Sequence, residues 1–390
     1  MLNLLVNKKE FNFSSLNLAW RVSGVDELNF EPIIELSPDF FNTQDFFLSQ
    51  NLVEFFDDEI LLFQGFTDNI DFNFGKNNTF SIKCSGILKT LENSKITDKK
   101  EFINASIVDI LNSNPNGIKF ANYNLDDYQI IFSQIVKNDS YFSLLDTLSK
   151  RFGFDYWFDY QSLTCWLGSA DKTINVTDDD ISNGKVNIPS KINYKKDKIV
   201  NSIQVEAGVA NLIGLEKTSL DLQKKFGYGI QSKIDKFSNT VIYYIKDDIS
   251  IKKYGLRENL FTPLDIKTKN LDQLELLEIS NLLYKVAVAE INNYKNPLIL
   301  INNLKFYQEK AWQEITLFNN FKIQLQDISS SFFSGFDSIM QIADISLVFE
   351  SRDSSEGYYN LSLVSFVDKN KKEERVLNSI IAKYNRLVTI

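Results

Sequence analysis

Residues 139–167 constrain the fold of this chain most, because they read as one helix that leads directly into a hairpin. The side-chain oxygen of Asp139 or Ser140 can accept a free backbone N–H and so begin the helix. Apolar residues then recur at helical spacing and predict one buried face. They are Tyr141, Leu144, Leu145, Leu148 and Phe152. Lys150 and Arg151 in the last turn complement the helix dipole.

The predicted hairpin follows this helix without a linker. Gly153 suits a left-handed helix end. Residues 154–158 and 163–167 have the pattern of strands, and residues 159–162 between them have the composition of a turn. Regions with a different, β-rich texture flank the unit on both sides. We therefore interpret residues 93–190 as a mixed α/β middle module between two sheet-built halves.

Residues 1–92 are predicted to be mostly strands, because apolar runs alternate or continue between turn residues. The predicted strands are residues 2–6, 16–22, 45–56, 60–71 and 79–84. Gly86 ends the last of them, and residues 87–91 are expected to form a short helix. Several antiparallel strands joined by hairpins indicate a barrel or a sandwich.

Within the middle module, a second helix is predicted from a cap at Asn104 or Ser106. Its apolar residues are Ile107, Val108, Ile110 and Leu111. A strong turn follows at residues 114–117, and a strand is expected at residues 130–132. Residues 178–182, Asp-Asp-Asp-Ile-Ser, and Pro189 mark the end of the module.

Residues 191–370 are predicted to return to strands that helices interrupt. The expected strands are residues 199–205, 240–245, 298–301, 304–307, 321–325, 339–349 and 359–366, with a hairpin loop at 351–357. The expected helices are a short one from Asp247 to Tyr254, one over residues 271–292 that Pro297 ends, and a terminal one over residues 371–386. Residues 212–236 show no pattern that assigns them.

The composition fits a β-rich chain with a packed core. Among 390 residues there are 32 Phe and 16 Tyr, and aromatic side chains favour strands. The length predicts two or three domains. Gly and Pro number 15 and 6, which argues against low-complexity linkers.

The net charge of −9 argues against tight, direct binding of nucleic acid, which requires a basic patch. An acidic wall would repel DNA, a property that suits a conduit. No uninterrupted apolar run reaches the roughly 18 residues of a membrane span. The charges of the first residues, MLNLLVNKKEF, follow the apolar ones, the reverse of a secretory signal. We expect neither a membrane span nor a signal peptide.

The sequence offers little material for a reacting site. It contains no His, so the commonest general base, His-based triads and His-bearing zinc sites are excluded. It also lacks a Gly-Lys-Ser/Thr phosphate loop and a GxGxxG motif. Cys84 and Cys165 are too few for a metal site and are expected to be buried thiols. We expect no catalytic residue, no cofactor and no metal, and predict that the protein is not an enzyme.

Three weaker patterns have ordinary structural interpretations. Residues 227–229, Gly-Tyr-Gly, are expected to form a turn. Residues 178–180, Asp-Asp-Asp, lack the spacing of a calcium loop and favour a solvated, capping turn over a cation site. The aromatic run 154–160 favours core packing over a sugar platform. Paired carboxylates could cleave glycosides, but 51 acidic residues give too many pairs to single one out.

Several segments resemble motifs of the tail hub proteins of bacteriophages, the family of baseplate and tail-tip hubs. Residues 63–68, FQGFTD, resemble the family's F-x-G strand. Residues 79–84, TFSIKC, followed by Leu88, resemble the strand that pairs with it and leads to a short helix. Residues 140–167 resemble the family's middle module, a helix that ends in a Gly-Phe pair before a hairpin.

Two further segments continue the resemblance in the family's order. Residues 194–205, YKKDKIVNSIQV, resemble the N-x-I-x-V start of the second barrel, and residues 248–257, DISIKKYGLR, resemble the S-I-x-x-Y-G-x-R helix end. The helix from residue 271 fits the next element, so the resemblance covers about residues 60–300. The last third departs from the pattern: residues 318–320, Phe-Asn-Asn, stand where the family has Gly-Asp.

The resemblance implies a β-rich α+β fold with two tail-tube-like barrels. The expected domains are a first barrel over residues 1–92, the middle module over residues 93–190, a second barrel over residues 191–370 with a helix inserted at 268–296, and a C-terminal helix over residues 371–390. It also implies a homotrimer that joins a hexameric tail tube to a three-fold spike or fibre and forms part of the DNA conduit. The expected partners are the tail tube or distal tail protein ring, the spike or fibre protein and the tape measure protein, all in the virion at the tail tip.

Three other functions remain open from the sequence. A carbohydrate-binding host-contact protein would need an exposed aromatic groove, for which residues 156–160 are the candidate. A glycan-cleaving enzyme would need one essential pair of carboxylates. Hubs of related contractile injection systems share the expected fold, so the sequence does not separate them from phage hubs.

Overall fold

The computed structural model describes residues 2–33, 49–73, 79–96, 100–123, 132–136, 139–152, 154–168, 172–187, 192–207, 214–237, 240–261, 273–307, 319–325, 336–349, 357–365 and 388–389. Strands outnumber helices in these residues, which confirms the predicted β-rich α+β class. Among the helices described, none has both the length and the apolar character that crossing a bilayer requires.

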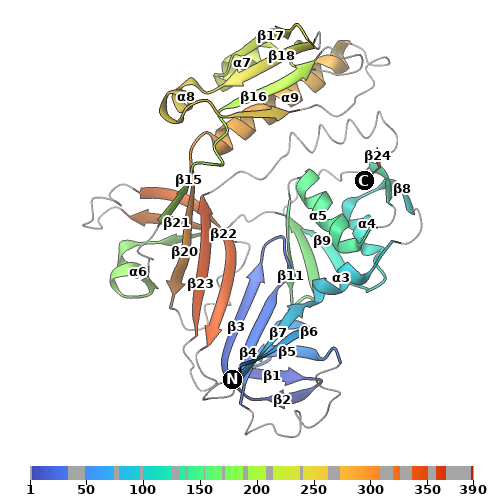
Figure 1. The fold of residues 1–390 in the computed structure, drawn as a ribbon, viewed down its shortest axis with the longest axis vertical. Helices are drawn as coiled ribbons and strands as arrows, with labels where there is room; N and C mark the ends of the chain where they lie inside the picture. Colours follow the sequence, from blue (N-terminus) through green and yellow to red (C-terminus); the bar gives the residue numbers. More distant parts are fainter. Residues whose placement is uncertain are drawn as a thin grey trace.

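A large curled sheet forms the body of the molecule (Figure 1), with 14 strands among the described residues. Its first half contains β1 (Leu2–Val6), β2 (Lys9–Phe11), β3 (Phe13–Arg21), β4 (Glu27–Pro32), β5 (Leu52–Asp57), β6 (Ile60–Asn73) and β7 (Thr79–Gly86). Its second half contains β13 (Lys172–Val176), β14 (Val186–Asn187), β15 (Ile192–Lys195), β20 (Leu298–Phe306), β21 (Asn319–Leu325), β22 (Phe336–Phe349) and β23 (Tyr358–Ser365).

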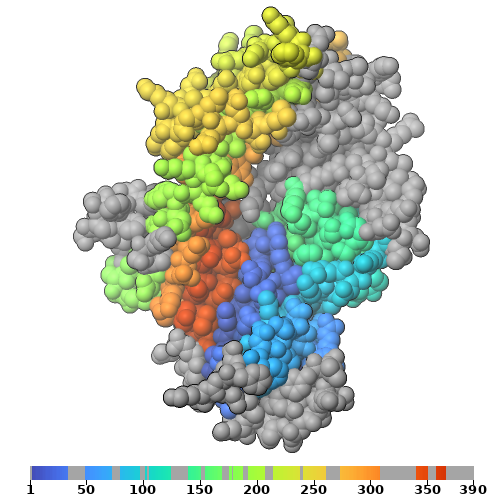
Figure 2. Space-filling view, viewed as in Figure 1, coloured from blue at the N-terminus to red at the C-terminus, as the bar shows by residue number. Residues whose placement is uncertain are grey.

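The two halves are joined edge to edge. β3 pairs antiparallel with β22, and this register places Trp20 opposite Ile345. In Figure 2 the blue surface of the first half adjoins the orange and red surface of the second. The sequence predicted two barrels, whereas the described strands of both halves share one curled sheet. The division of the chain at residues 92 and 190 stays a prediction.

A close backbone approach explains the glycine of the F-x-G strand. Gly65 lies opposite Gly86 where β6 pairs with β7. A Cβ on Gly65 would lie 2.2 Å from the backbone oxygen of Ser85 and 2.7 Å from the Phe63 ring. No larger residue fits there without movement of the strands, so packing requires the glycine of this motif.

The middle module packs beside the first half of the sheet (Figure 1). The 3-10 helix η2 (Ile87–Lys89) and α3 (Thr90–Asn93) lead into it, and its own elements begin with β8 (Lys100–Ala105), α4 (Ile107–Asn112), β9 (Lys119–Tyr123) and β10 (Phe132–Val136). They continue with α5 (Tyr141–Phe152), β11 (Asp155–Asp159) and β12 (Thr164–Gly168). The helix α6 (Asp178–Ser182) lies instead against β14, beside the second half of the sheet (Figure 1). The three-stranded sheet β11-β12-β9 combines the predicted hairpin with a strand that the sequence did not reveal.

The predicted helix of this module is confirmed in its bounds, its cap and its buried face. The N–H of Ser143 donates to Ser140 Oγ at 3.1 Å, so Ser140 is the cap. Leu144, Leu145 and Leu148 are fully buried. In α4 the Ser106 hydroxyl caps the helix through a reciprocal pair of hydrogen bonds with Asp109, which selects Ser106 of the two predicted candidates.

A small α/β unit leaves the large sheet and returns to it at the same place. It consists of β16 (Ser202–Ala207), α7 (Leu220–Phe226), β17 (Ile230–Asp235), β18 (Thr240–Lys246), α8 (Asp248–Tyr254), β19 (Glu258–Phe261) and α9 (Gln273–Tyr294). The strands β15 and β20 on either side of it pair with each other. The four-stranded sheet β17-β18-β16-β19 and α9 share a second core, which includes Ile203, Val205, Ile245 and Leu283.

Other predictions differ from the structure in instructive ways. The expected strands 298–301 and 304–307 are one strand, β20, with a register shift between Ile301 and Leu304. Residues 212–236, in which no sequence pattern was found, contain α7 and β17. The expected terminal helix at 371–386 lies outside the described residues, and β24 (Val388–Thr389) pairs with β10.

Candidate functional site

A buried carboxylate lies where the first half of the sheet meets the middle module. Asp26, in the turn between β3 and β4, is 3% exposed. Its Oδ2 accepts a 2.7 Å hydrogen bond from the Tyr160 hydroxyl, and its Oδ1 accepts a 2.8 Å bond from the backbone N–H of Arg21. Burial raises the pKa of Asp26 to about 7, because the charged form loses its hydration. This carboxyl therefore fixes the contact between two parts of the fold.

The same turn is bonded to the middle module through its backbone. The N–H of Ser23 donates to the Tyr156 carbonyl at 2.7 Å. The Ser23 hydroxyl donates to Asp155 Oδ1 at 3.1 Å. With Asp26 and Tyr160, these bonds make the joint between sheet and module specific rather than a sliding apolar contact.

The aromatic run of the hairpin belongs to the core. Tyr156 and Trp157 are 0% and 2% exposed, and Phe158 and Tyr160 are also buried. The Tyr160 ring packs 5.7 Å from the ring of Phe63, measured between centroids. Core packing, the favoured interpretation of this run, is confirmed, and the aromatic groove expected for a sugar platform at residues 156–160 is not formed.

The remaining sequence patterns also have structural roles. Gly227 is the left-handed end of α7, so residues 227–229 are a turn. Asp180 caps α6 reciprocally with Thr177, which is the capping role expected of the acidic run. Within the part of the chain that the structure describes, no three acidic or Cys side chains gather in a way that could hold a metal ion. Cys84 and Cys165 are buried free thiols, as expected, and burial raises the pKa of both.

Two motifs that lie far apart in sequence meet at one asparagine. Asn201, fully buried before β16, donates from Nδ2 to the Gly255 carbonyl at 2.8 Å. Its Oδ1 accepts the N–H of Arg257 at 2.7 Å. Asn201 belongs to the N-x-I-x-V segment, and Gly255 and Arg257 belong to the S-I-x-x-Y-G-x-R segment. The two motifs are therefore joined by hydrogen bonds at Asn201 and form one connected part of the small unit.

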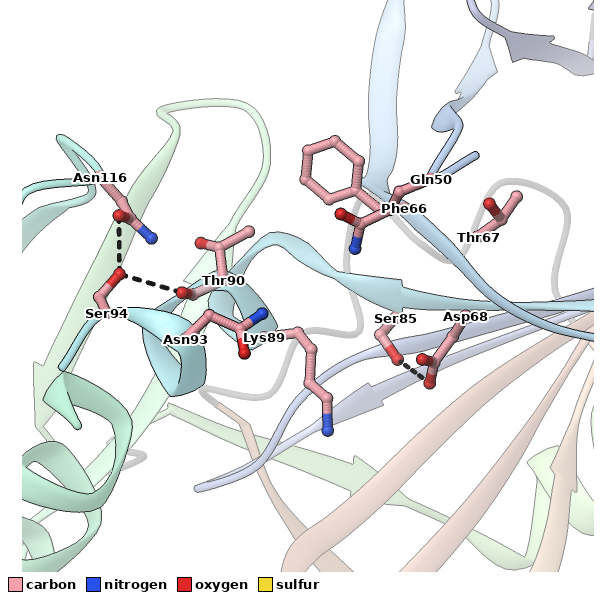
Figure 3. A pocket seen from close by; sticks show the side chains of 10 residues that line it. All are labelled: Gln50, Phe66, Thr67, Asp68, Ser85, Lys89, Thr90, Asn93, Ser94 and Asn116. Atoms are coloured by element: carbon pink, nitrogen blue, oxygen red, sulfur yellow. Dashed lines mark hydrogen bonds between the residues drawn. The ribbon is translucent and has the colours of Figure 1, made fainter. Parts of the chain in front are cut away.

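A polar cavity of about 330 Å³ lies between the first half of the sheet and the helix that follows it (Figure 3). The sheet side is formed by Gln50, Phe66, Thr67, Asp68 and Ser85. Phe66 is half-buried and Gln50 is exposed. The Ser85 hydroxyl donates to Asp68 Oδ2 at 3.0 Å, and this hydrogen bond orients the carboxylate.

The opposite side of the cavity comes from η2, α3 and the turn after α4. Its residues are Lys89, Thr90, Asn93, Ser94 and Asn116. The buried Ser94 hydroxyl lies 2.7 Å from Asn116 Oδ1 and orients that amide. Lys89 Nζ lies 2.9 Å from Glu92 Oε2, and this hydrogen bond, with the charges of Glu92, Asp68 and Glu27, raises the pKa of Lys89. These residues come from separate segments, so the sequence carried no local signal for the cavity.

Comparison with known proteins identifies the fold. No protein-family model matches the sequence, and no curated protein matches it. The 43 kDa tail protein of prophage MuSo2 from Shewanella oneidensis superposes with a TM-score of 0.59 at 13% identity, over 95% of this chain and 98% of that one. A tail protein from Neisseria meningitidis MC58 superposes with a TM-score of 0.59 at 12% identity, over 95% and 98%. The chain therefore has a fold found in phage tail proteins.

Proposed function

We propose that this chain is a structural protein of a phage tail, a homotrimeric hub at the distal end. In this role it joins the hexameric tail tube to a three-fold spike or fibre and lines part of the DNA conduit. The observation that carries the proposal is the superposition with two tail proteins over nearly the whole of all three chains. The hub motifs of residues 60–300 follow the order that they have in the hub family. This order supports the more specific role of a hub among tail proteins.

The open form of the large sheet supports assembly into a ring. In the described part of the chain, the sheet runs from β2 at one end to β14 at the other and does not close on itself. The edge of a sheet presents unpaired N–H and C=O groups, which can pair with strands of another chain. Closed rotational symmetry is the usual way in which identical chains satisfy such surfaces. Three copies would then supply a ring with a near-six-fold inner wall.

The negative charge of the chain suits a wall along which DNA moves without binding. A net charge of −9 repels phosphates and disfavours tight binding at any register. A conduit wall needs this property, because DNA must move through it. The partners under this proposal are the tail tube or distal tail ring, the spike or fibre and the tape measure protein. Function then resides in surfaces and not in a reacting site.

Immunogold electron microscopy of particles released from producing cells tests this proposal. We expect label at one end of tails only, in three copies or a small multiple per particle. Light scattering of the purified chain should give the mass of a trimer. Label at DNA-containing, headed particles favours a phage hub over the hub of a contractile injection system. Unlabelled particles, or protein found only free or on cells, would overturn the tail assignment.

A further inference from the structure

We propose that the polar cavity between β6, β7 and α3 binds a neutral saccharide unit. The cavity combines one aromatic ring, side-chain amides and hydroxyls around about 330 Å³, at the small end of the range for ligand sites. Sugars present apolar C–H faces that pack on a ring and hydroxyls that bond to amides. This inference does not depend on the proposed role in the tail.

Two amides at the cavity are available to a ligand. In the described part of the chain, the side chains of Gln50 and Asn93 make no hydrogen bond with protein groups. Figure 3 shows Gln50 and Phe66 on one side of the cavity, with Thr90 and Asn93 across from them. An amide offers both a donor and an acceptor, the combination that a sugar hydroxyl pair requires. A pair of such groups facing a half-buried ring can hold a ligand that is polar at its rim and apolar on one face.

A third amide is already oriented. Ser94 Oγ lies 2.7 Å from Asn116 Oδ1, which fixes the amide plane and leaves the nitrogen free to donate. On the sheet side, Thr67 Oγ1 accepts the backbone N–H of the buried Asn51 at 2.9 Å, so its hydroxyl hydrogen is free to bond outward. A site whose polar groups are held before binding loses less side-chain freedom when the ligand arrives.

The charges of the described residues at the cavity disfavour an anionic ligand. Among the described residues that line the cavity, Lys89 is the one cation, and Glu92 Oε2 lies 2.9 Å from Lys89 Nζ. Asp68 contributes the opposite charge on the other side. With Glu92 counted, the surroundings are net acidic, which disfavours phosphates and sugar acids. Of the lining residues that the structure describes, Phe66 is the only large apolar one, which disfavours an apolar ligand, and Asp68 is the only carboxylate, which is too few for a metal ion.

Saturation-transfer-difference NMR on the full chain tests the site, with glucose and N-acetylglucosamine as neutral probes and glucuronate as a charged one. We expect weak, saturable transfer from at least one neutral sugar and none from glucuronate at pH 7. The variants are Phe66→Ala, which removes the ring, and Asn93→Ala at an exposed position that does not threaten the fold. Each should weaken binding about threefold to tenfold.

Phe72→Ala is the matched control, because Phe72 is a 49% exposed ring on the same strand and does not line the cavity. Its affinity for the sugar should equal that of the unmodified chain. A flat titration with both neutral sugars, or glucuronate binding as tightly as they do, would overturn the proposal. So would an affinity that Asn93→Ala leaves unchanged, or one that Phe72→Ala lowers as much as Phe66→Ala does. None of these outcomes bears on the location of the protein in a tail.

Discussion

The Tyr160 hydroxyl donates a 2.7 Å hydrogen bond to the carboxylate of Asp26, and both side chains are buried. The bond connects the turn before β4 to the end of the β11 strand in the middle module. A buried carboxyl with only neutral donors is costly to ionise. The joint between sheet and module therefore has a stability that depends on pH.

Asp26 should make the protein less stable as pH rises through mildly acidic values. Its pKa is about 7 in the folded state, against an ordinary value of 3.8. Between these values the folded state holds a proton that the unfolded state has lost, so stability falls with rising pH. Above pH 7 the full ionisation cost applies, on the order of 4 kcal/mol. Urea unfolding at pH 5 and pH 8 should differ by about 3 kcal/mol, because part of the cost is already present at pH 5.

Asp26→Asn removes the titrating group and should flatten this dependence. The matched control is Asp344→Asn, because Asp344 is a half-exposed carboxylate whose Oδ1 lies 3.5 Å from an Arg21 guanidinium nitrogen. That control should keep the slope of the unmodified protein. If Asp26→Asn and the unmodified chain lost stability in parallel from pH 5 to pH 8, another group would be responsible.

Tyr160→Phe should destabilise the fold by about 1–3 kcal/mol, because it removes a donor from a buried acceptor. The loss should be larger at pH 8 than at pH 5, since a hydrogen bond to a charged carboxylate is stronger than one to the neutral acid. Tyr359→Phe is the control: the Tyr359 hydroxyl is buried with no hydrogen-bond partner among the described groups. Its removal should leave stability equal or slightly higher. Equal losses of unfolding free energy in the two variants would show that the hydrogen bond to Asp26 does not contribute to stability.

Gly65→Ala should destabilise the first half of the sheet by about 1–3 kcal/mol or prevent folding, because the added Cβ overpacks the β6–β7 pair. That Cβ would lie 2.2 Å from the Ser85 carbonyl oxygen, which is backbone and cannot rotate away. Gly229→Ala is the control, since a Cβ there meets no atom within 4 Å. Thermal unfolding followed by circular dichroism compares the two. A Gly65→Ala protein as stable as the control would contradict the packing account of the F-x-G motif.

Local patterns predicted local elements well. α5 carried a cap, a five-residue apolar face and basic residues in its last turn, and its bounds are those expected. β17 (IQSKID) carried no such pattern: four of its six residues are exposed, and its ladder with β18 holds it in place. β9 was missed for a similar reason, because Phe120 is the one residue of that strand that is fully buried.

Long-range pairing was the part that sequence could not supply. The two β-rich halves were recognised, but nothing in β3 or β22 indicates that Trp20 and Ile345 face each other across one ladder. The cavity and the Asp26 joint could not be predicted from the sequence for the same reason, because each is formed by segments that only the fold brings together. The resemblance identified the two motifs of the small unit separately. Only the structure shows that they are hydrogen-bonded to each other at Asn201.

Asn201→Ala should loosen the small unit and leave the large sheet intact. The substitution removes the hydrogen bonds of Asn201 with the Arg257 N–H and the Gly255 carbonyl, at a cost of about 0.5–1.5 kcal/mol for each. The small unit has its own core, so amide hydrogen exchange should accelerate in β16, β18 and α9 while β3 to β7 keep their protection. Asn259→Ala, an exposed asparagine on the neighbouring strand β19, should change neither region. Faster exchange throughout both cores in Asn201→Ala would mean that the unit and the sheet unfold as one body.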